Sequence, residues 1–536
     1  MREASSGWSE ESAGGVLCNL SACGAGCNQL TVFPLNSAPG GIYFSIWYTK
    51  RLRNSFGDRP LDAAAAKPSR IAVIGGGISG LAAAHRLHEL APSTEITLYE
   101  ASERLGGVLE TQHHDGYLAE QSADTFITNV PWGLDLCRRL GIDGDLVPTN
   151  DALRKAYVVS RGKLVDVPEG FLLMAPGKAW PIITSPILSP AGKLRLAWEY
   201  FVPQRKETGD ESLKSFVVRR LGRETYERLV QPLIGGIYTA DPEKLSIAAT
   251  MKQFVEMERQ HGGLIRGMRK RQADSAKTDS GARYSMFVAP KEGMSTIINA
   301  LAARLPEGSI RLNSPVRSVE RLSEGAWQVT TAGGADTFDG VIAAAPAPAA
   351  ARLFEAFDPT LAGELGQIEY AGCAIVLLGV RRDQIAKPIA GFGFVVPEVE
   401  NRRILAASFA SYKFPGRSPD DSVLIRVFVG GACHKEMNEL PEQELRRIAL
   451  EELADLIGLS GEPQLFMVRR WSAQMPQYHV GHLELVERIE QLAAKHPGLQ
   501  LTGNAYHGVG VPLCVRTSEQ AAERLVKQLH LSQVER

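Results

Sequence analysis

A short apolar strand that leads through a glycine-rich turn into a helix restricts the fold of this chain more than any other feature. Residues 71–74 are apolar, and Gly75, Gly77 and Gly80 follow in the spacing G-x-G-x-x-G before an alanine-rich stretch. Glycines at these places allow a tight turn, a close approach of the backbone to a pyrophosphate, and contact between helix and strand. The N–H groups at the helix N-terminus favour phosphate charge. The sequence therefore predicts an α/β fold that binds a nucleotide.

An acidic residue at the end of the next apolar run narrows the type of nucleotide. Glu100 closes the run 95–99, twenty positions after Gly80, where a carboxylate can accept hydrogen bonds from a ribose and disfavours a 2′-phosphate. NADP is therefore not expected, whereas the turn alone leaves NAD and FAD open. Arg104 and a glycine pair at 106–107 place a cation and flexible backbone where the far half of a dinucleotide would lie, which favours FAD.

Composition excludes several classes of function. The chain has 536 residues, too many for one core, and its 59 basic and 60 acidic side chains give a net charge of −1, so no nucleic acid partner is expected. Its seven cysteines are scattered, which indicates reduced thiols in a cytoplasmic protein and predicts neither a disulfide framework nor a metal site. No segment reaches the ~20 apolar residues of a membrane span. Any membrane contact is expected to be peripheral, at the inner face of the cell membrane.

The order of the patterns along the chain predicts a discontinuous architecture. Residues 1–68 are rich in Ser, Gly and Ala and lack periodicity, so we expect a disordered N-terminal extension. The strand and helix pattern of the first domain returns beyond Met286 and again at the end of the chain. The predicted parts are a Rossmann-like FAD-binding domain (69–150, 286–345 and 466–536), a mixed-sheet substrate-binding domain (151–170, 232–285 and 346–465) and a helical insertion (171–231) that could face a membrane.

Strand patterns in the middle of the chain predict a wall for a ligand. A hairpin is expected at 157–165, with its turn at Arg161 and Gly162. Basic residues at 266–277 predict an exposed loop, which is usually only a solvated face but could attract an anionic substrate or lipid head groups. Four apolar runs with short connections predict an antiparallel sheet suited to a large flat ligand, at 374–380, 391–397, 404–409 and 423–429.

Five motifs together carry a resemblance to a known family. They are GGGISGL at 75–81, SERLGG at 102–107, DPEKLS at 241–246, PQYHVGH at 476–482 and YHGVGV at 506–511. The chain resembles the oxygen-dependent protoporphyrinogen and coproporphyrinogen oxidases, FAD flavoproteins of the amine oxidase superfamily. The first two motifs are shared with amine oxidases and carotenoid desaturases, and the other three are more specific. The resemblance covers about residues 69–530.

The resemblance implies an FAD-dependent enzyme of haem biosynthesis. Its expected reaction is the six-electron oxidation of protoporphyrinogen IX to protoporphyrin IX with oxygen as acceptor. The alternative is oxidation of coproporphyrinogen III to coproporphyrin III, and a further alternative is another FAD amine oxidase or a carotenoid desaturase. The remaining hypothesis is that the protein is a non-catalytic nucleotide-binding module. The flavin performs the chemistry, so no catalytic side chain is expected. Expected partners are the porphyrinogen, oxygen, a ferrochelatase that receives the product, and a second copy in a homodimer.

The resemblance also implies site residues. Phe409 and Val395 match residues that line the substrate site, and Ala156 stands where some relatives have an arginine that anchors the substrate, so Arg154 or Lys155 is expected to replace it. At 122–126 the chain has SADTF where relatives often have GPDSF, which changes the backbone freedom near the flavin. The implied FAD contacts are Gly75, Gly76, Gly77, Ile78, Ser79, Gly80, Glu100, Arg104, Gly107, Val108, Ser122, Ala123, Asp124, Thr125, Val316, Val509, Gly510 and Val511.

Overall fold

A five-stranded parallel sheet combines strands from three distant stretches of the chain. The structure, a computed structural model, describes residues 69–207, 209–275, 286–387 and 390–534, so the predicted extension at 1–68 lies outside the described residues. The α/β fold class with a discontinuous nucleotide-binding part is confirmed. The strand order is β12 (Ile310–Arg311), β2 (Glu95–Tyr99), β1 (Arg70–Ile74), β16 (Gly340–Ala343) and β22 (Leu499–Leu501).

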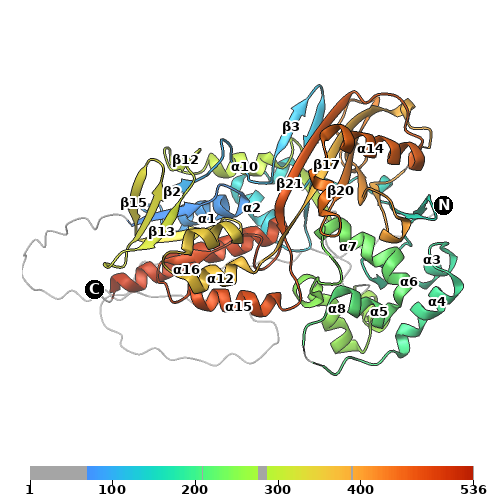
Figure 1. Ribbon diagram of the computed structural model, residues 1–536, viewed down its shortest axis with the longest axis horizontal. Helices are drawn as coiled ribbons and strands as arrows, with labels where there is room; N and C mark the ends of the chain where they lie inside the picture. Colours follow the sequence, from blue (N-terminus) through green and yellow to red (C-terminus); the bar gives the residue numbers. More distant parts are fainter. Residues whose placement is uncertain (1–68, 208, 276–285, 388–389, 535–536) are drawn as a thin grey trace, which may run out of the picture. The chain divides into compact units, whose positions relative to one another are not determined.

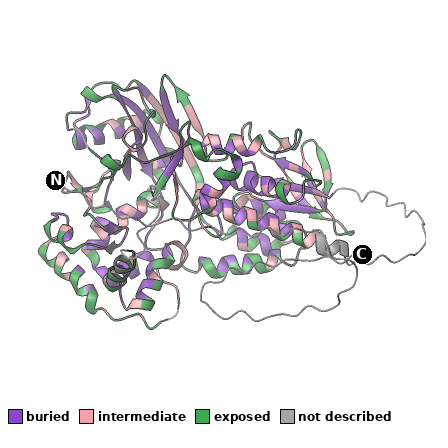
Figure 2. Ribbon diagram, turned by 180° about the vertical axis from the view of Figure 1, so that it is seen from behind, coloured by how far each residue is buried: buried purple, intermediate pink, exposed green. Residues whose placement is uncertain are grey.

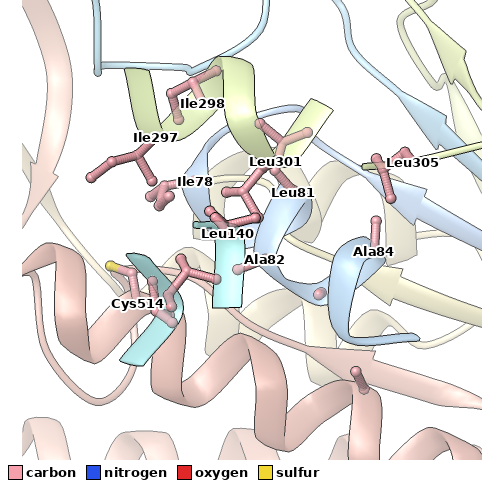
Figure 3. Close-up of a cluster of buried hydrophobic side chains, with 14 of the residues drawn as sticks. Ile78, Leu81, Ala82, Ala84, Leu140, Ile297, Ile298, Leu301, Leu305 and Cys514 are labelled. Carbon is pink, nitrogen blue, oxygen red and sulfur yellow. The ribbon is translucent and has the colours of Figure 1, made fainter. Parts of the chain in front are cut away.

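The helices beside this sheet pack through one apolar cluster. The alanines 82–84 of α1 are fully buried, and their small side chains allow neighbouring elements to approach closely. Figure 3 shows apolar side chains from these helices converging around Leu81 and Leu140, with Cys514 at one side. The helices are α1 (Ile78–Leu90), α2 (Trp132–Leu140), α10 (Ser295–Ala302) and α16 (Val511–Val534).

A seven-stranded sheet forms the second large layer of strands. All its neighbouring strands are antiparallel except β18 and β7, so the sheet is mixed, and the predicted hairpin is present as β7 and β8. Its last strand runs to Pro476, so residues 466–476 belong to this sheet and not to the parallel one, contrary to the expected boundary at 466. The strand order is β21 (Leu465–Pro476), β17 (Tyr370–Arg381), β20 (Ser422–Gly430), β19 (Ala406–Phe409), β18 (Gly393–Val395), β7 (Ala156–Ser160) and β8 (Lys163–Asp166).

The two faces of the seven-stranded sheet have different chemistry. Side chains alternate between the faces along each strand. Phe409 and Ile425 are paired and lie on the face that packs against α14 (Glu442–Ile457). The paired residues Ser408 and Arg426 lie on the opposite face, which we call the site face. Figure 1 shows α14 beside the strands β17 and β20.

Smaller elements connect these two sheets and cover the parallel one. The hairpin β3 (Thr111–His114) and β4 (Tyr117–Glu120) follows the first strand pair, and a three-stranded sheet places β11 (Phe287–Pro290) between β5 (Phe126–Ile127) and β6 (Leu146–Pro148). Further elements outside the two large sheets are β13 (Ser318–Arg321), β14 (Trp327–Thr331), β15 (Gly334–Phe338), α11 (Ala347–Phe354), α12 (Pro359–Gly366), α13 (Ala410–Lys413) and α15 (His482–Ala493).

Helices dominate the chain between β8 and β11. Ser189 caps α4, since its hydroxyl accepts a hydrogen bond from Gly192 N, and Pro190 occupies the first turn, as the sequence predicts. The expected basic loop at 266–277 is wrong, because residues up to Ser275 form α9; Lys277 lies outside the described residues. The helices are α3 (Ala179–Thr184), α4 (Pro190–Ala197), α5 (Leu213–Leu221), α6 (Arg223–Thr225), α7 (Gln231–Tyr238), α8 (Ile247–His261) and α9 (Leu264–Ser275).

A buried ion pair holds these helices together. The side chains of Arg220 and Glu199 are both fully buried and pair with each other. Glu199 also accepts hydrogen bonds from the backbone N–H groups of Leu264 (2.8 Å) and Ile265 (3.1 Å), so it caps the N-terminus of α9. The carboxylate therefore connects α5 and α9 through one charge.

Removal of this charge should destabilise the protein. We expect Glu199→Gln to lower the free energy of unfolding by about 3 kcal/mol, because the buried Arg220 would lose its nearest counter-ion and keep only Glu258, which lies 3.4 Å away and also pairs with Arg219. Urea unfolding followed by circular dichroism measures the change. The matched control is Glu207→Gln, which removes an exposed partner of Arg205 and should cost less than about 1 kcal/mol. Equal losses in both variants would contradict the structural role given to Glu199.

Candidate functional site

The glycine turn between β1 and α1 has the geometry of an anion site. A Cβ on Gly80 would lie 1.8 Å from the carbonyl oxygen of Gly75, so only glycine fits where helix and strand cross. Gly75 has a φ of +109°, which favours glycine. Gly77 is the N-cap of α1 and makes no side-chain cap bond, and a Cβ there would meet only the Cα of Gly107, at 3.9 Å. The first turn of α1 can therefore receive phosphate charge.

Glu100 lies directly beside this turn. Its Oε2 accepts a hydrogen bond from Gly76 N at 2.7 Å, and its Oε1 accepts from the N–H and the hydroxyl of Ser102 at 2.8 and 2.7 Å. The carboxylate follows β2 and is only partly buried. It is thus an accessible acceptor next to the anion site, the place at which a ribose hydroxyl pair of a dinucleotide would lie.

The segment after Glu100 returns to the glycine turn. Gly106 N donates to Gly76 O at 2.8 Å, and Arg104 Nη2 donates to Gly107 O at 2.7 Å while pairing with Glu110 at 2.9 Å. The structure therefore brings the predicted residues Arg104 and Gly107 to the turn.

A second loop joins the first one. The Ser122 hydroxyl donates to the carbonyl oxygen of Val108, and the Thr125 hydroxyl donates to Val288 O at 2.8 Å. Trp471 on the site face donates through its indole N–H to Gln121 O at 2.6 Å. The loop 122–125 therefore lies between the glycine turn and the seven-stranded sheet.

Asp124 links this loop to the seven-stranded sheet through charge. Lys413 Nζ donates to both carboxylate oxygens, at 2.7 and 3.0 Å, and Arg426 Nη1 lies 3.1 Å from Oδ2. Although burial opposes ionisation, these two cations lower the pKa of Asp124 to about 2. Asp124 therefore stays charged at neutral pH.

The start of α16 is fixed by the motif at 476–482. Tyr478 Oη donates to Asn504 O at 2.6 Å and accepts from Gly508 N at 2.8 Å, while its ring stacks on His482 at 3.9 Å. These bonds position Val509, Gly510 and Val511, the residue at which α16 begins.

One apolar cluster joins a predicted cofactor residue to a predicted substrate residue. Val509 and Val395 both pack against the cluster that contains Val158 and Tyr478. Val395 and Val158 are paired in the sheet and point to the site face. A Cβ on Gly236 of α7 would lie 3.6 Å from Val395 Cγ1, so the backbone of α7 approaches this wall.

The structure does not bring all predicted residues together. Phe409 is fully buried on the opposite face of the sheet, where its ring stacks on Tyr412 at 5.7 Å. Its substrate role stays a prediction. Arg154 and Lys155 are exposed at the start of β7, 3.9 and 3.7 Å from Asp151 and Asp166.

The remaining cofactor residue lies at the parallel sheet. Val316 packs partly buried against the cluster that contains Tyr99, which is the last residue of β2 and directly precedes Glu100. This position suits the adenine end of a dinucleotide, and the contact itself stays a prediction.

Sequence reasoning missed several charged and aromatic residues on the site face. Arg426 interrupts the otherwise apolar strand Ser422–Gly430 and is 2% exposed. A lone arginine in a buried strand is itself a signal of a buried charge site. Arg469 pairs with Glu110 at 2.7 Å and lies over the Trp471 ring at 4.3 Å. The Nε atoms of Arg426 and Arg469 are buried and lack a hydrogen-bond partner, so each retains a free donor.

These features fit a flavin dinucleotide. The start of α1 and the Glu100 carboxylate lie together at the glycine turn, and Arg104 and Arg469 share the carboxylate of Glu110 nearby. The start of α16 supplies further backbone donors. A family model described as "Flavin containing amine oxidoreductase" matches residues 78–526. The chain belongs to this family. It is a flavin-dependent oxidoreductase, as the sequence predicts.

Individual relatives show which members of this family the chain resembles. The coproporphyrinogen III oxidase of Bacillus subtilis (strain 168) is 32% identical over 458 residues, which cover 84% of this chain and 96% of the relative. Protoporphyrinogen oxidase 2 of Arabidopsis thaliana is 26% identical, with coverage of 88% and 96%. A crystal structure from Exiguobacterium sp. 255-15, provisionally named protoporphyrinogen oxidase, superposes with a TM-score of 0.77 at 29% identity and covers 86% of this chain and 99% of its own. The predicted membership of the porphyrinogen oxidases is confirmed.

A buried carboxyl beside the loop 122–125 predicts a pH-dependent stability. Glu120 is 2% exposed, and burial raises its pKa to about 7 although Met294 N and the Thr111 hydroxyl donate to it at 2.7 and 2.9 Å. The folded protein therefore binds more protons than the unfolded chain between about pH 4.5 and pH 7. The contribution of Glu120 to the free energy of unfolding falls as the pH rises through this window.

Glu120→Gln should remove this dependence. Between pH 5 and pH 8 we expect the free energy of unfolding of the unmodified protein to fall by roughly 3 kcal/mol more than that of the variant. Urea unfolding at both pH values measures the difference. Glu484→Gln, at an exposed position of α15, is the control and should follow the unmodified protein. The interpretation fails if Glu120→Gln retains the full pH dependence.

Proposed function

We propose that the protein is an FAD-dependent coproporphyrinogen III oxidase of haem biosynthesis that forms coproporphyrin III with oxygen as acceptor. The observation that supports this choice is the greater identity to the bacterial coproporphyrinogen enzyme than to the plant protoporphyrinogen enzyme. Oxidation of protoporphyrinogen IX, the first expectation from the sequence, becomes the alternative. An amine or carotenoid substrate has less support, since the named relatives above are porphyrinogen oxidases.

The side chains of the site would bind and position the reactants. FAD bound there would supply the redox chemistry, a two-electron oxidation in each of three rounds with oxygen as the final acceptor, so the six hydrogens removed would appear as three hydrogen peroxide molecules. The turn 75–80 and Glu100 would hold the pyrophosphate and ribose, and the loop 122–125 with Val509–Val511 would flank the ring system. The partly exposed Val395, which pairs with the fully buried Val158, would supply an apolar surface for the macrocycle.

The cations at the start of β7 suit a substrate with four carboxylates. Ala156 leaves space on the site face of the sheet, and the exposed Arg154 and Lys155 directly precede it. Their ion pairs with Asp151 and Asp166 are long, so both cations remain accessible to a substrate carboxylate. Transfer of the product to a ferrochelatase and a homodimeric state belong to the same proposal.

Turnover of the two porphyrinogens tests the function. The purified protein, supplied separately with coproporphyrinogen III and protoporphyrinogen IX, should show a kcat/KM about tenfold higher for the tetracarboxylate, measured by porphyrin fluorescence. The double change Arg154→Glu and Lys155→Glu should raise KM for coproporphyrinogen several-fold while flavin stays bound. Lys163→Glu, at the other end of the hairpin, is the matched control. Flavin-loaded protein that is inert with both substrates would refute the proposal.

We also propose a peripheral contact with an anionic membrane. No helix among the described residues is both long and apolar enough to span a bilayer. Five large apolar side chains between α3 and the 3₁₀ turn after α4 are nevertheless 56–74% exposed, and we call them the aromatic patch: Trp180, Ile183, Leu194, Trp198 and Phe201. Figure 2 shows exposed ribbon over much of the helical part, whereas the strands of the large sheets are mostly buried.

Cations border the aromatic patch. Arg266 lies over the Tyr200 ring at 4.4 Å, and Arg269, Lys270 and Arg271 follow it on the exposed surface of α9. A hollow of about 720 Å³ beside the patch is lined by residues 200–206, Gly262 and Arg266. Exposed aromatic side chains next to cations match the interface of an anionic bilayer.

Vesicle binding tests this contact. The protein should cosediment with phosphatidylglycerol vesicles and only weakly with phosphatidylcholine vesicles. The double change Trp198→Ser and Phe201→Ser should reduce binding at least tenfold, because it removes the buried apolar area. Leu483→Ser removes an exposed apolar side chain of α15 and should leave binding unchanged. Equal partition of the unmodified protein with and without anionic lipid would contradict the electrostatic part of the proposal.

A further inference from the structure

Five ionisable side chains are gathered in the interior next to the loop 122–125. Three are cations and two are carboxylates, and each comes from a different element of the fold. Arg426 is contributed by β20, Lys413 by α13, Arg417 by the following loop, Glu120 by β4, and Asp124 by the loop itself. Arg417 and Arg426 are 1% and 2% exposed. We call this group the buried charge cluster.

The cluster contains more positive than negative charge. Asp124 is the shared counter-ion of Lys413 and Arg426, so one carboxylate faces two cations. Arg417 donates only to backbone carbonyls, those of Lys291 and Pro290 at 2.5 and 2.9 Å. Glu120 makes its hydrogen bonds to Met294 N and Thr111. With both carboxylates ionised, the five buried or partly buried side chains carry one net positive charge, and outside the cluster the exposed Glu292 also attracts Arg417.

Folding alone gives no reason for this arrangement. Burial of an uncompensated cation costs free energy, and an apolar replacement of similar volume would be at least as stable. Buried charges that persist in spite of this cost are concentrated at functional sites. The Arg426 Nε atom is buried without a partner, so one donor of the cluster is not used within the protein. An additional negative charge near the cluster would balance its net positive charge, and it could accept a hydrogen bond from the Arg426 Nε–H group.

The cluster is connected to the backbone that would contact the flavin. Arg426 Nη2 donates to Ser122 O, and the Ser122 hydroxyl donates to Val108 O, so the guanidinium is one residue from the glycine-rich segment. Trp471 donates to the neighbouring Gln121 O from the same face of the sheet. The charge of the cluster therefore lies directly behind the loop that the proposed cofactor site uses.

We propose that the buried charge cluster raises the reduction potential of the bound flavin by stabilising the negative charge that the ring gains on reduction. Lys413, Asp124 and Arg426 act as positioning residues, and none of them exchanges a proton or an electron with the substrate. The inference rests on the proposed FAD site. The inference adds a prediction about the reduction potential of the flavin: removal of a positive charge should lower it and removal of a negative charge should raise it. A change in packing alone would not give shifts of opposite sign.

Charge substitutions of opposite sign test the inference. Lys413→Met removes a positive charge, so the two-electron midpoint potential of the flavin-loaded protein should fall. Asp124→Asn removes a negative charge, so the potential should rise. Each change should alter the equilibrium about tenfold, which corresponds to about 30 mV for two electrons. Lys413→Arg retains the charge and should keep the original potential.

A second measurement does not depend on the porphyrinogen substrate. Sulfite adds to oxidised flavins to give a negatively charged adduct, so its dissociation constant reports the same field. We expect about tenfold weaker sulfite binding in Lys413→Met and tighter binding in Asp124→Asn. Spectral titration of the purified flavoprotein gives both values.

The outcomes separate this inference from the proposed function. Failure of the unmodified protein to bind FAD would refute the cofactor proposal. Bound flavin whose potential and sulfite affinity are unchanged in both Lys413→Met and Asp124→Asn would refute the inference alone. A shift of the same sign in both variants would assign the cluster a structural role and overturn the electrostatic one. If Lys413→Met does not fold, the inference still predicts a higher potential in Asp124→Asn and an unchanged one in Lys413→Arg, and a fall or no change in Asp124→Asn would refute it.

Discussion

The buried carboxylate of Asp124 connects the loop 122–125 to the seven-stranded sheet. It lies on the loop between β4 and β5, and its partners Lys413 and Arg426 belong to α13 and to β20 of the seven-stranded sheet. A charge held by two cations inside the protein has a narrow choice of positions, because any displacement leaves a charge unpaired in a medium of low dielectric. The relative placement of the glycine turn and the apolar wall, on which any flavin chemistry depends, follows from this contact.

The site combines an anion-binding turn with an apolar wall, and the chain supplies the two through different means. The turn depends on backbone geometry at Gly75 and Gly80, where side chains are excluded by contact. The wall depends on side-chain alternation along β18 and β7, which places Val395 and Val158 on one face. Tyr478 then ties the start of α16 to both, since it donates to Asn504 O and accepts from Gly508 N. A turn suited to a nucleotide phosphate and a separate apolar surface are consistent with membership of the flavin amine oxidoreductases.

Local sequence patterns predicted where helices and strands form better than they predicted which strands pair with one another. The strand, turn and helix at 70–90, the Ser189 cap and the hairpin turn at Arg161 and Gly162 depend on neighbouring residues, and all are present. The assignment of 466–476 and the basic loop before Ser275 were wrong. A strand does not encode which sheet it joins, because that choice depends on partners a hundred residues away. A basic run is compatible with a helix whenever its charges can face solvent.

The sequence by itself determined the nucleotide turn, the acid that follows it, and the family to which the chain belongs. These features are short, and their chemistry requires particular residue types at fixed spacing. Only the tertiary structure decided which face of the seven-stranded sheet meets the loop 122–125, and it placed Phe409 away from that face and Arg426 on it. The same folding step gathered Glu120, Asp124, Lys413 and Arg426 into one buried cluster. Such a cluster arises from contacts between residues up to three hundred positions apart, which no local pattern records.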